Sequence, residues 1–256
     1  MRLSPFARLD AHFAPAPEHR RVAFLTAQPF AHRGLHGAGR IENSRAAFAA
    51  AIAAGHGIEL DVQASRDGEA FVFHDEALDR LTGESGPLAN RSGAALAAIA
   101  LRGSDETMPR LDEILALVAG RAPILIEVKT RGANGGTLCL AVRRTLEGYR
   151  GQAAVMSFDP EVGRWFAEHA PRVVRGLVVT EEGQHGIGGY LRRHAALWRA
   201  RPDFLAYDVR DLPSRFAATA RTRGMPLLTW TVRDAVSEAT GMTHADEIIY
   251  ERPEAA

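Results

Sequence analysis

Short apolar runs rich in β-branched residues alternate along the chain with longer segments whose apolar positions recur at helical spacing. This alternation is typical of a parallel α/β sheet, in which each strand is followed by a helix. The pattern predicts strands at Pro29–Gly34, Gly57–Gln63, Ala70–His74, Pro123–Lys129, Ala154–Phe158, Val174–Val179, Asp203–Asp208, Pro226–Thr231 and Glu247–Tyr250. It predicts helices after Ser44, which we expect to act as an N-cap, and at Leu111–Ala119, Thr137–Tyr149, Pro160–His169 and Ser214–Arg223.

The length of 256 residues suits a single α/β barrel, which typically takes about 250 residues. The pattern gives one strand more than a barrel needs, and we place the surplus around Ser65–Gly68, where the connection is too short for a crossover helix. The sequence therefore predicts one barrel domain over residues 29–256. We expect a glycine-, serine- and alanine-rich insertion on its rim at about 75–109, and an N-terminal extension over 1–28 packed on its outside.

Composition narrows the class of protein. Apolar residues make up 46% of the chain and charged residues 24%, as in soluble globular proteins. The 31 basic and 31 acidic residues cancel, so nucleic acid is not an expected partner. The only cysteine, Cys139, fits a reducing compartment, and the longest low-charge apolar stretch, Ala46–Ala54, is too short to span a membrane. No signal peptide is evident, and we expect a cytoplasmic protein.

Charged residues interrupt two of the predicted apolar strands. Glu59 and Asp61 are two residues apart, which places both on one face of a strand, and Glu127 and Lys129 share the same spacing on another strand. If both faces point into the mouth of a barrel, three carboxylates converge, and oxygen-only ligation suits Mg²⁺ or Ca²⁺. The alternative is structural: solvated charges on edge strands, or an ion pair of Lys129 with Glu59 or Asp61.

Lys129 is the only lysine among the 31 basic residues. This suggests that a compact ammonium is needed at that position, where the wider guanidinium of arginine would not fit. A lone lysine near the end of a barrel strand is also what a Schiff-base aldolase shows. The neighbouring carboxylates argue against an aldolase, because they favour the charged ammonium.

Two of the ten histidines lie where a predicted strand meets its loop. His32 precedes Arg33 and Gly34, and His74 precedes Asp75, so the two imidazoles could act as general base and general acid. A zinc site of His32 with His36 is disfavoured, because Gly34 and Gly37 argue against the helix that would align residues four apart, and no cysteine is nearby. The remaining histidines that we assign are expected to be solvated: His12, His19, His169, His185, His194 and His244.

Six motifs in order resemble the glycerophosphodiester phosphodiesterase family over roughly residues 29–252. They are His32-Arg33-Gly34, Glu42-Asn43-Ser44, Glu59-Leu60-Asp61-Val62, His74-Asp75 with Leu78, Arg80 and Thr82, Pro109-Arg110-Leu111, and Glu127-Val128-Lys129. The resemblance implies a (β/α)8 TIM barrel, irregular around its second and third strands, with the site at the carboxyl ends of the strands. It also implies metal-dependent hydrolysis of a glycerophosphodiester to glycerol 3-phosphate and an alcohol, in glycerol and lipid metabolism.

Carried over position by position, the resemblance assigns the metal to Glu59, Asp61 and Glu127, and phosphate binding to Arg33 and Lys129. The metal would be Mg²⁺ or Ca²⁺, with Mn²⁺ as an alternative. Glu42 would lie close to the metal, as a ligand or hydrogen-bonded next to one. His32 and His74 would be the acid–base pair, and we take His74 as the acid.

The second half departs from the family pattern. Trp230-Thr231-Val232-Arg233 stands where the family often has Trp-Thr-Val-Asn, and Ile248–Pro253 lacks the usual threonine and aspartate. Trp230 would either line the substrate pocket or pack in the core. These changes leave the alcohol group open, and phospholipase D-like action on lysophospholipids is an alternative, as is a barrel that binds phosphodiesters without turnover. The expected partner is a small-molecule substrate, and the sequence does not fix the oligomeric state.

Overall fold

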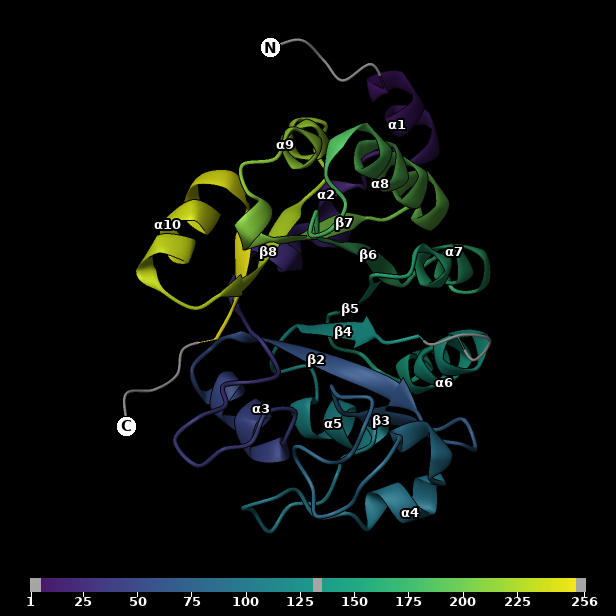
Figure 1. Ribbon diagram of the computed structural model, residues 1–256, viewed down its shortest axis with the longest axis vertical. Coiled ribbons are helices and arrows are strands. Elements are labelled where there is room, and N and C mark those ends of the chain that lie inside the picture. Colours follow the sequence, from purple (N-terminus) through teal and green to yellow (C-terminus); the bar gives the residue numbers. More distant parts are fainter. Residues whose placement is uncertain (1–5, 131–134, 252–256) are drawn as a thin grey trace. The chain divides into compact units, whose positions relative to one another are not determined.

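Each strand range predicted from the sequence overlaps a strand in the structure, a computed structural model that describes residues 6–130 and 135–251. The chain forms two compact units (Figure 1). Unit 1 consists of Met1–Pro29 and Ala154–Tyr250, and unit 2 consists of Phe30–Ala153 and Glu251–Ala256. Parallel strands alternate with helices in both, which is the element order of a (β/α)8 barrel.

Unit 2 is organised around the long strand β2 (Gly57–Ala64). It pairs in parallel with β1 (Phe30–Ala31) and with β4 (Ile124–Val128), and in the second pairing Asp61 lies opposite Glu127. The surplus strand is β3 (Ala70–Val72), which follows the short connection around Ser65–Gly68 where we placed the surplus, and the structure shows that it runs antiparallel to β2. Because β2 bends back directly into β3, the regular strand–helix alternation is interrupted at this point.

Helices and a long loop segment complete unit 2. Helix α3 (Arg45–Ala53) begins at Ser44, whose Oγ accepts a hydrogen bond from the Ala47 N–H at 3.1 Å, which confirms the predicted N-cap. The other helices are α5 (Leu111–Val118) and α6 (Gly135–Glu147). Between β3 and α5 the chain forms loops with η2 (Leu88–Asn90) and α4 (Gly93–Ala97). This segment has its own apolar core: Phe71, Phe73, Leu78, Leu88, Leu96, Leu101 and Met108.

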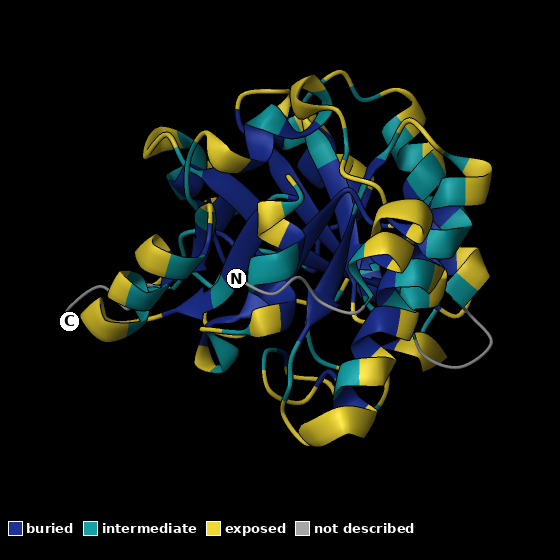
Figure 2. Cartoon of the chain, turned by 90° about the horizontal axis from the view of Figure 1, so that it is seen from above, coloured by how far each residue is buried: buried dark blue, intermediate teal, exposed yellow. Residues whose placement is uncertain are grey.

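Unit 1 contains five strands, β5 (Ala153–Ser157), β6 (Val174–Val179), β7 (Phe204–Asp208), β8 (Leu227–Val232) and β9 (Glu247–Tyr250). Each pairs in parallel with the next. Helices α7 (Pro160–His169), α8 (Gly186–Ala200), α9 (Arg215–Thr222) and α10 (Ala235–His244), with η4 (Val209–Asp211), form the connections. The N-terminal residues form α1 (Ala7–Phe13), α2 (His19–Val22) and η1 (Ala23–Thr26). Figure 2 shows buried strands, with helices that are exposed along one side.

Helix α8 was not among the predicted helices, and the prediction for His194, which lies on it, is wrong. Glycines at 186, 188 and 189 occupy its first turn, where they weaken the helical signal of the sequence. His194 lies on its inner face and is buried, so the prediction of a solvated histidine is wrong. Its Nδ1 hydrogen-bonds to the carboxylate of Asp10, 184 residues away in sequence, at 2.8 Å. Sequence gives no sign of so distant a partner.

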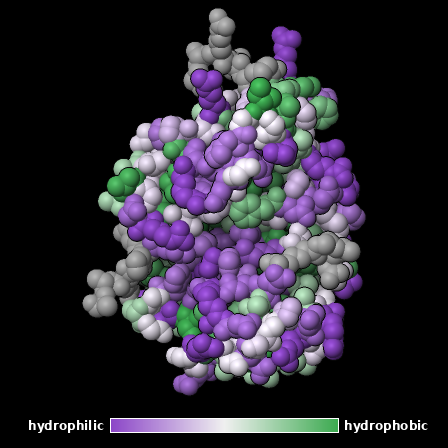
Figure 3. All heavy atoms as spheres, in the orientation of Figure 1, coloured by the Kyte–Doolittle hydropathy of each residue, from purple (hydrophilic) through white to green (hydrophobic). Residues whose placement is uncertain are grey.

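The surface of the described residues carries no broad apolar region in the view of Figure 3, where hydrophilic side chains predominate and hydrophobic ones are scattered among them. Exposed large apolar side chains include Leu9, Phe13, Phe158, Ile187, Leu191, Val236 and Met242. Within residues 6–130 and 135–251, no helix combines the length and apolar character needed to cross a membrane.

Candidate active site

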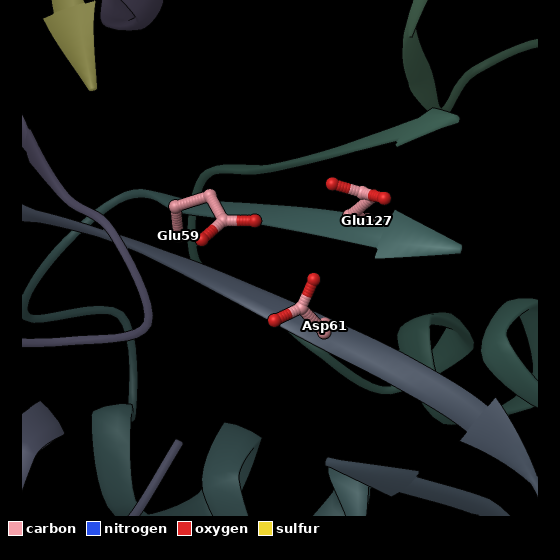
Figure 4. A group of neighbouring side chains, drawn as sticks. All are labelled: Glu59, Asp61 and Glu127. Carbon is pink, nitrogen blue, oxygen red and sulfur yellow. The ribbon is translucent and has the colours of Figure 1, made fainter. Parts of the chain in front are cut away.

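Three buried carboxylates converge in unit 2, as the spacing of the sequence predicted. Glu59 and Asp61 project from one face of β2, and Glu127 projects from β4 opposite Asp61. One oxygen from each lies within 4.8 Å of the others, and Figure 4 shows the three groups directed toward one another. Their exposed fractions are 0%, 1% and 8%, so water does not screen their mutual repulsion.

Two cations partly balance this charge. Lys129 Nζ donates to Glu127 Oε1 at 2.8 Å and lies 3.1 Å from Asp61 Oδ1, so the predicted ion pair with Asp61 is present within the carboxylate cluster. Arg33 Nε lies 3.4 Å from Asp61 Oδ2, and the Arg33 backbone N–H donates to Glu59 Oε2 at 3.0 Å. The left-handed conformation of Arg33, with φ of 56°, presents this N–H to the cluster at the end of β1.

The pKa values of the three carboxyls diverge. Burial raises the pKa of Glu59 well above its ordinary value, and the charges of Asp61 and Glu127 raise it further. Burial also raises the pKa of Glu127, although Lys129 opposes the change. For Asp61 burial acts upward, but Lys129 and Arg33 outweigh it and lower the pKa. The cluster is therefore short of positive charge, and the shortage is greatest at Glu59.

Glu59 has an unusual oxygen that bears on metal binding. Its Oε1 is buried and has no hydrogen-bond partner in the structure. A buried, unpaired carboxylate oxygen is costly unless something positive is meant to contact it. Hard divalent cations such as Mg²⁺ and Ca²⁺ take carboxylate oxygens as ligands, so the donor set of Glu59, Asp61 and Glu127 fits such an ion.

The two predicted histidines both use Nδ1 to contact a carboxylate. His32 Nδ1 hydrogen-bonds to Glu251, and His32 Nε2 lies 3.8 Å from Glu59 Oε2. His74 Nδ1 is 2.7 Å from Asp75 Oδ1. Burial lowers the pKa of both histidines below the ordinary value, with Glu251 opposing the shift at His32. Both rings therefore favour the neutral form, in which Nε2 can take up a proton.

Glu42 lies near this group but outside the three-carboxylate cluster. Its Oε1 accepts from Arg33 Nη1 at 2.8 Å and from Arg80 Nη2 at 2.7 Å, and its Oε2 accepts from Arg80 Nη1 at 2.8 Å. Burial opposes ionisation, but the two arginines outweigh it and lower the pKa of Glu42. The sequence predicts that Glu42 either binds the metal or lies next to one of its ligands. Its contacts fit the second position better, because Arg33, which binds Glu42, also lies beside Asp61.

Trp230 belongs to unit 1, at the carboxyl-terminal half of β8. Its Nε1 donates to the Ala206 carbonyl at 2.9 Å, and its ring meets Phe158 edge-on with centroids 5.4 Å apart. Phe158 is 45% exposed, so this aromatic pair is only partly covered. The contacts fit both predicted roles of Trp230, because the ring is anchored yet not enclosed.

Sequence reasoning missed two residues that hold the site together. Asn43 is buried, and its Nδ2 donates to Asp61 Oδ2 at 2.9 Å; the signal in the sequence is its place beside Glu42 in the second motif. Glu251 lies in the segment that departs from the family pattern, yet it bonds to His32. The separation of 219 residues leaves no local signal for that contact.

Comparison with known proteins decides the family. Residues 32–255 match the model of the glycerophosphoryl diester phosphodiesterase family. The chain belongs to this family. Membership confirms the family predicted from the six motifs.

Individual relatives agree with this family. A glycerophosphodiester phosphodiesterase of Bacillus altitudinis is 36% identical over 111 residues, which span 41% of this chain and 45% of the relative, less than half the length of either. The glycerophosphodiester phosphodiesterase structure from Thermotoga maritima is 25% identical with a TM-score of 0.70, covering 86% of this chain and 92% of that one. A phosphodiesterase from Oleispira antarctica has a TM-score of 0.77 at 20% identity, covering 88% and 93%. These structures confirm the predicted (β/α)8 barrel.

Proposed function

We propose that this protein hydrolyses glycerophosphodiesters to glycerol 3-phosphate and an alcohol. The observation that carries the proposal is the buried cluster of Glu59, Asp61 and Glu127, which stands beside two cations in a member of a phosphodiesterase family. The Oleispira antarctica structure is a complex with the product sn-glycerol-3-phosphate. A glycerol phosphate is thus a ligand of a protein with this fold, which supports a small-molecule substrate here.

Glu59, Asp61 and Glu127 would hold a divalent cation, Mg²⁺ or Ca²⁺, with Mn²⁺ as an alternative. Support comes from the unpaired, buried Oε1 of Glu59 and from the raised pKa of that group, because a bound cation would relieve both. When bound, such a cation supplies Lewis acidity at a phosphate oxygen.

Arg33 and Lys129 would bind the phosphate oxygens. A phosphodiester carries one negative charge, and more negative charge gathers on its oxygens as the bond to the alcohol breaks, so fixed cations favour the transition state. The carboxylates of Asp61 and Glu127 outweigh burial and raise the pKa of Lys129. Lys129 therefore stays an ammonium, which suits phosphate binding and opposes the imine chemistry of a Schiff-base aldolase.

His32 and His74 would move the protons. Each ring contacts a carboxylate through Nδ1, which leaves Nε2 to face the reacting groups. His32 Nε2 would take the proton of the nucleophile, either water or a neighbouring hydroxyl of the substrate. His74 Nε2 would give a proton to the departing alkoxide. A neutral His74 must first be protonated, and the charge of the bound phosphodiester would help to raise its pKa.

Two further sequence-based conclusions stay predictions. One is the division into an N-terminal extension over 1–28 and a barrel over 29–256 with an insertion at about 75–109. The other is the cytoplasmic location. The alcohol group and the lysophospholipid alternative are also open, and both concern the part of the substrate beyond the phosphate.

A substrate panel tests the proposal. Purified protein would be assayed on glycerophosphodiesters with choline, ethanolamine, glycerol and inositol alcohols, and on a lysophospholipid, with glycerol 3-phosphate or lysophosphatidate measured as product. We expect chelation to abolish turnover and Mg²⁺, Mn²⁺ or Ca²⁺ to restore it. Full activity in excess chelator, with no metal found by elemental analysis, would overturn the metal assignment. No turnover of any diester with any of the three metals would overturn the activity.

A further inference from the structure

Arg80 connects two parts of the candidate site in unit 2, one containing His74 and the other containing Arg33. Its guanidinium contacts two carboxylates at once: Nε and Nη2 donate to Asp75 at 2.5 and 2.9 Å, and Nη1 and Nη2 donate to Glu42 at 2.8 and 2.7 Å. Asp75 in turn contacts His74 Nδ1, and Glu42 contacts Arg33 Nη1. A continuous chain of charge-assisted contacts therefore runs from His74 to Arg33 through Arg80.

The geometry of these contacts between His74 and Arg33 requires an arginine at position 80. Four hydrogen bonds leave three nitrogens of one planar group toward two different carboxylates, and only a guanidinium offers donors in that fixed fork. Isolated surface ion pairs contribute little, and the Arg80 side chain is 48% exposed. The contacts of Arg80 differ from an isolated surface pair, because two hydrogen bonds to each carboxylate fix the orientation of both carboxylates. The imidazole of His74 needs a fixed orientation if it acts as an acid or base.

The insertion after β3 holds Arg80 in place. Leu78 is fully buried in the apolar core of this segment, two residues before Arg80. On the other side, the Thr82 carbonyl accepts a hydrogen bond from Arg102 Nη2 at 2.6 Å, and the Thr82 N–H donates to the Leu78 carbonyl at 3.1 Å. The backbone on both sides of Arg80 is therefore anchored, while its side chain extends toward the site.

We infer that Arg80 is a positioning residue, which holds His74 through Asp75 and Arg33 through Glu42 in the arrangement that phosphodiester hydrolysis requires. This inference rests on the proposed function for its kinetic consequences. It also assigns a task to the insertion, whose core and Arg102 fix the segment that carries Arg80. Asp75 is the link to His74, and Arg80 lowers the pKa of Asp75 to about 2, so that the link stays ionised.

The kinetic test compares Arg80→Lys and Arg80→Ala with wild type. We expect kcat to fall about 10–100-fold in both variants, taking as a guide the loss seen when the hydrogen-bonded partner of a metal ligand is removed, with little change in KM. Lysine should fail like alanine because one ammonium cannot bridge both carboxylates in a bidentate manner. Arg91→Lys and Arg91→Ala are matched controls, since Arg91 lies in the same insertion and forms an exposed pair with Glu84. Both controls should retain wild-type kcat.

Two readouts distinguish a positioning role from a general loss of structure. The first is the rate of hydrolysis with a nitrophenyl leaving group compared with the rate with an alkyl alcohol; the difference should change in Arg80→Ala in the same direction as in His74→Ala. The second is the Nδ1 proton of His74 in the metal-free protein, followed by long-range ¹H–¹⁵N NMR; its signal should shift or be lost in Arg80→Ala and stay unchanged in Arg91→Ala.

A rise in KM without a fall in kcat would show that Arg80 binds substrate directly, which would overturn the inference. An unchanged His74 signal in Arg80→Ala would also overturn it. The NMR measurement needs no turnover, so it decides the positioning role even if the wild-type protein hydrolyses no diester. Failure of the proposed function is therefore distinguishable from failure of this inference.

Discussion

Two buried carboxylates, Asp10 in unit 1 and Glu59 in unit 2, meet opposite conditions. Asp10 Oδ1 accepts from His194 Nδ1 and from Trp198 Nε1, both at 2.8 Å, and Asp10 Oδ2 lies 3.5 Å from Arg223 Nη1. Glu59 has one oxygen with no partner and faces two further carboxylates.

The difference indicates a structural role for Asp10 and a binding role for Glu59. The donors around Asp10 offset the cost of burying it, and they tie α1 to α8 and to Arg223, which follows α9. At Glu59 the hydrogen bond from the Arg33 N–H to Oε2 offsets only part of this cost, because Oε1 has no partner, and such a group is retained for what it binds.

Neutralising the cluster should reduce activity most. Asp61→Asn and Glu127→Gln each remove a charge and nearly keep the shape, so we expect kcat/KM to fall by more than the roughly 10–100-fold that outer partners of a metal site cost. Asp10→Asn should keep wild-type kcat/KM at temperatures where it is folded. Steady-state kinetics at saturating Mg²⁺ would check this, and an Asp61→Asn enzyme with wild-type kinetics would remove the distinction between the two regions.

Two histidines, the half-buried His74 and the buried His194, should differ in the same way. His74→Ala should lower kcat by roughly 10²–10⁴-fold, the usual contribution of a general acid or base, with little change in the midpoint of thermal unfolding. A nitrophenyl diester should recover much of the loss if His74 is the acid, because that leaving group needs no proton. His194→Ala should instead lower the unfolding midpoint and leave kcat intact. The contrast fails if both variants lose only stability.

Lys129→Arg should have a moderate effect. The charge is kept, but the planar guanidinium needs more room between Asp61 and Glu127, so we expect kcat to fall roughly tenfold, or about 1.4 kcal/mol in the barrier. The matched control is Arg143→Lys, an exchange in an exposed helical pair with Glu147, which should change nothing. An arginine variant with wild-type kinetics would mean that the single lysine is an accident of composition.

The smallest expected effects concern the free energy of unfolding of the metal-free protein. It should rise in Glu59→Gln and fall in Asp10→Asn. The folded pKa of Glu59 lies well above its ordinary value of 4.5, so ionising Glu59 destabilises the fold. Below pH 4.5 this penalty is absent, and it grows as the pH rises toward the folded pKa. Glu59→Gln should therefore stabilise the metal-free protein increasingly above pH 4.5. Asp10→Asn should destabilise it, by about 1–3 kcal/mol, since it weakens paired, buried donors. Urea unfolding between pH 4 and 8 would show both signs.

The sequence predicted those features that depend on short spacings. The ranges Val174–Val179 and Glu247–Tyr250 coincide with β6 and β9, because apolar β-branched residues fill them. The carboxylate cluster could be predicted because a strand repeats every two residues, so Glu59 and Asp61 had to share a face.

Contacts between distant segments could not be predicted in this way. His194 resembled a solvated histidine because its partner lies 184 residues away and the glycines obscure α8. Glu251 and the fork of Arg80 were missed for a related reason: a charged residue in a loop shows its type in the sequence but not which way it points. The motif placed Arg80 correctly and left its role open.

Calorimetric titration of the metal-free protein with Mg²⁺ and Ca²⁺ decides whether Glu59 belongs to a metal site. We predict one site per chain in the wild-type protein and in Asp10→Asn. We predict no measurable binding in Glu59→Gln, even though that variant is expected to be more stable than Asp10→Asn. Unchanged binding by Glu59→Gln, or a wild-type protein that binds neither metal, would contradict the claim that the unpaired oxygen of Glu59 marks a metal site.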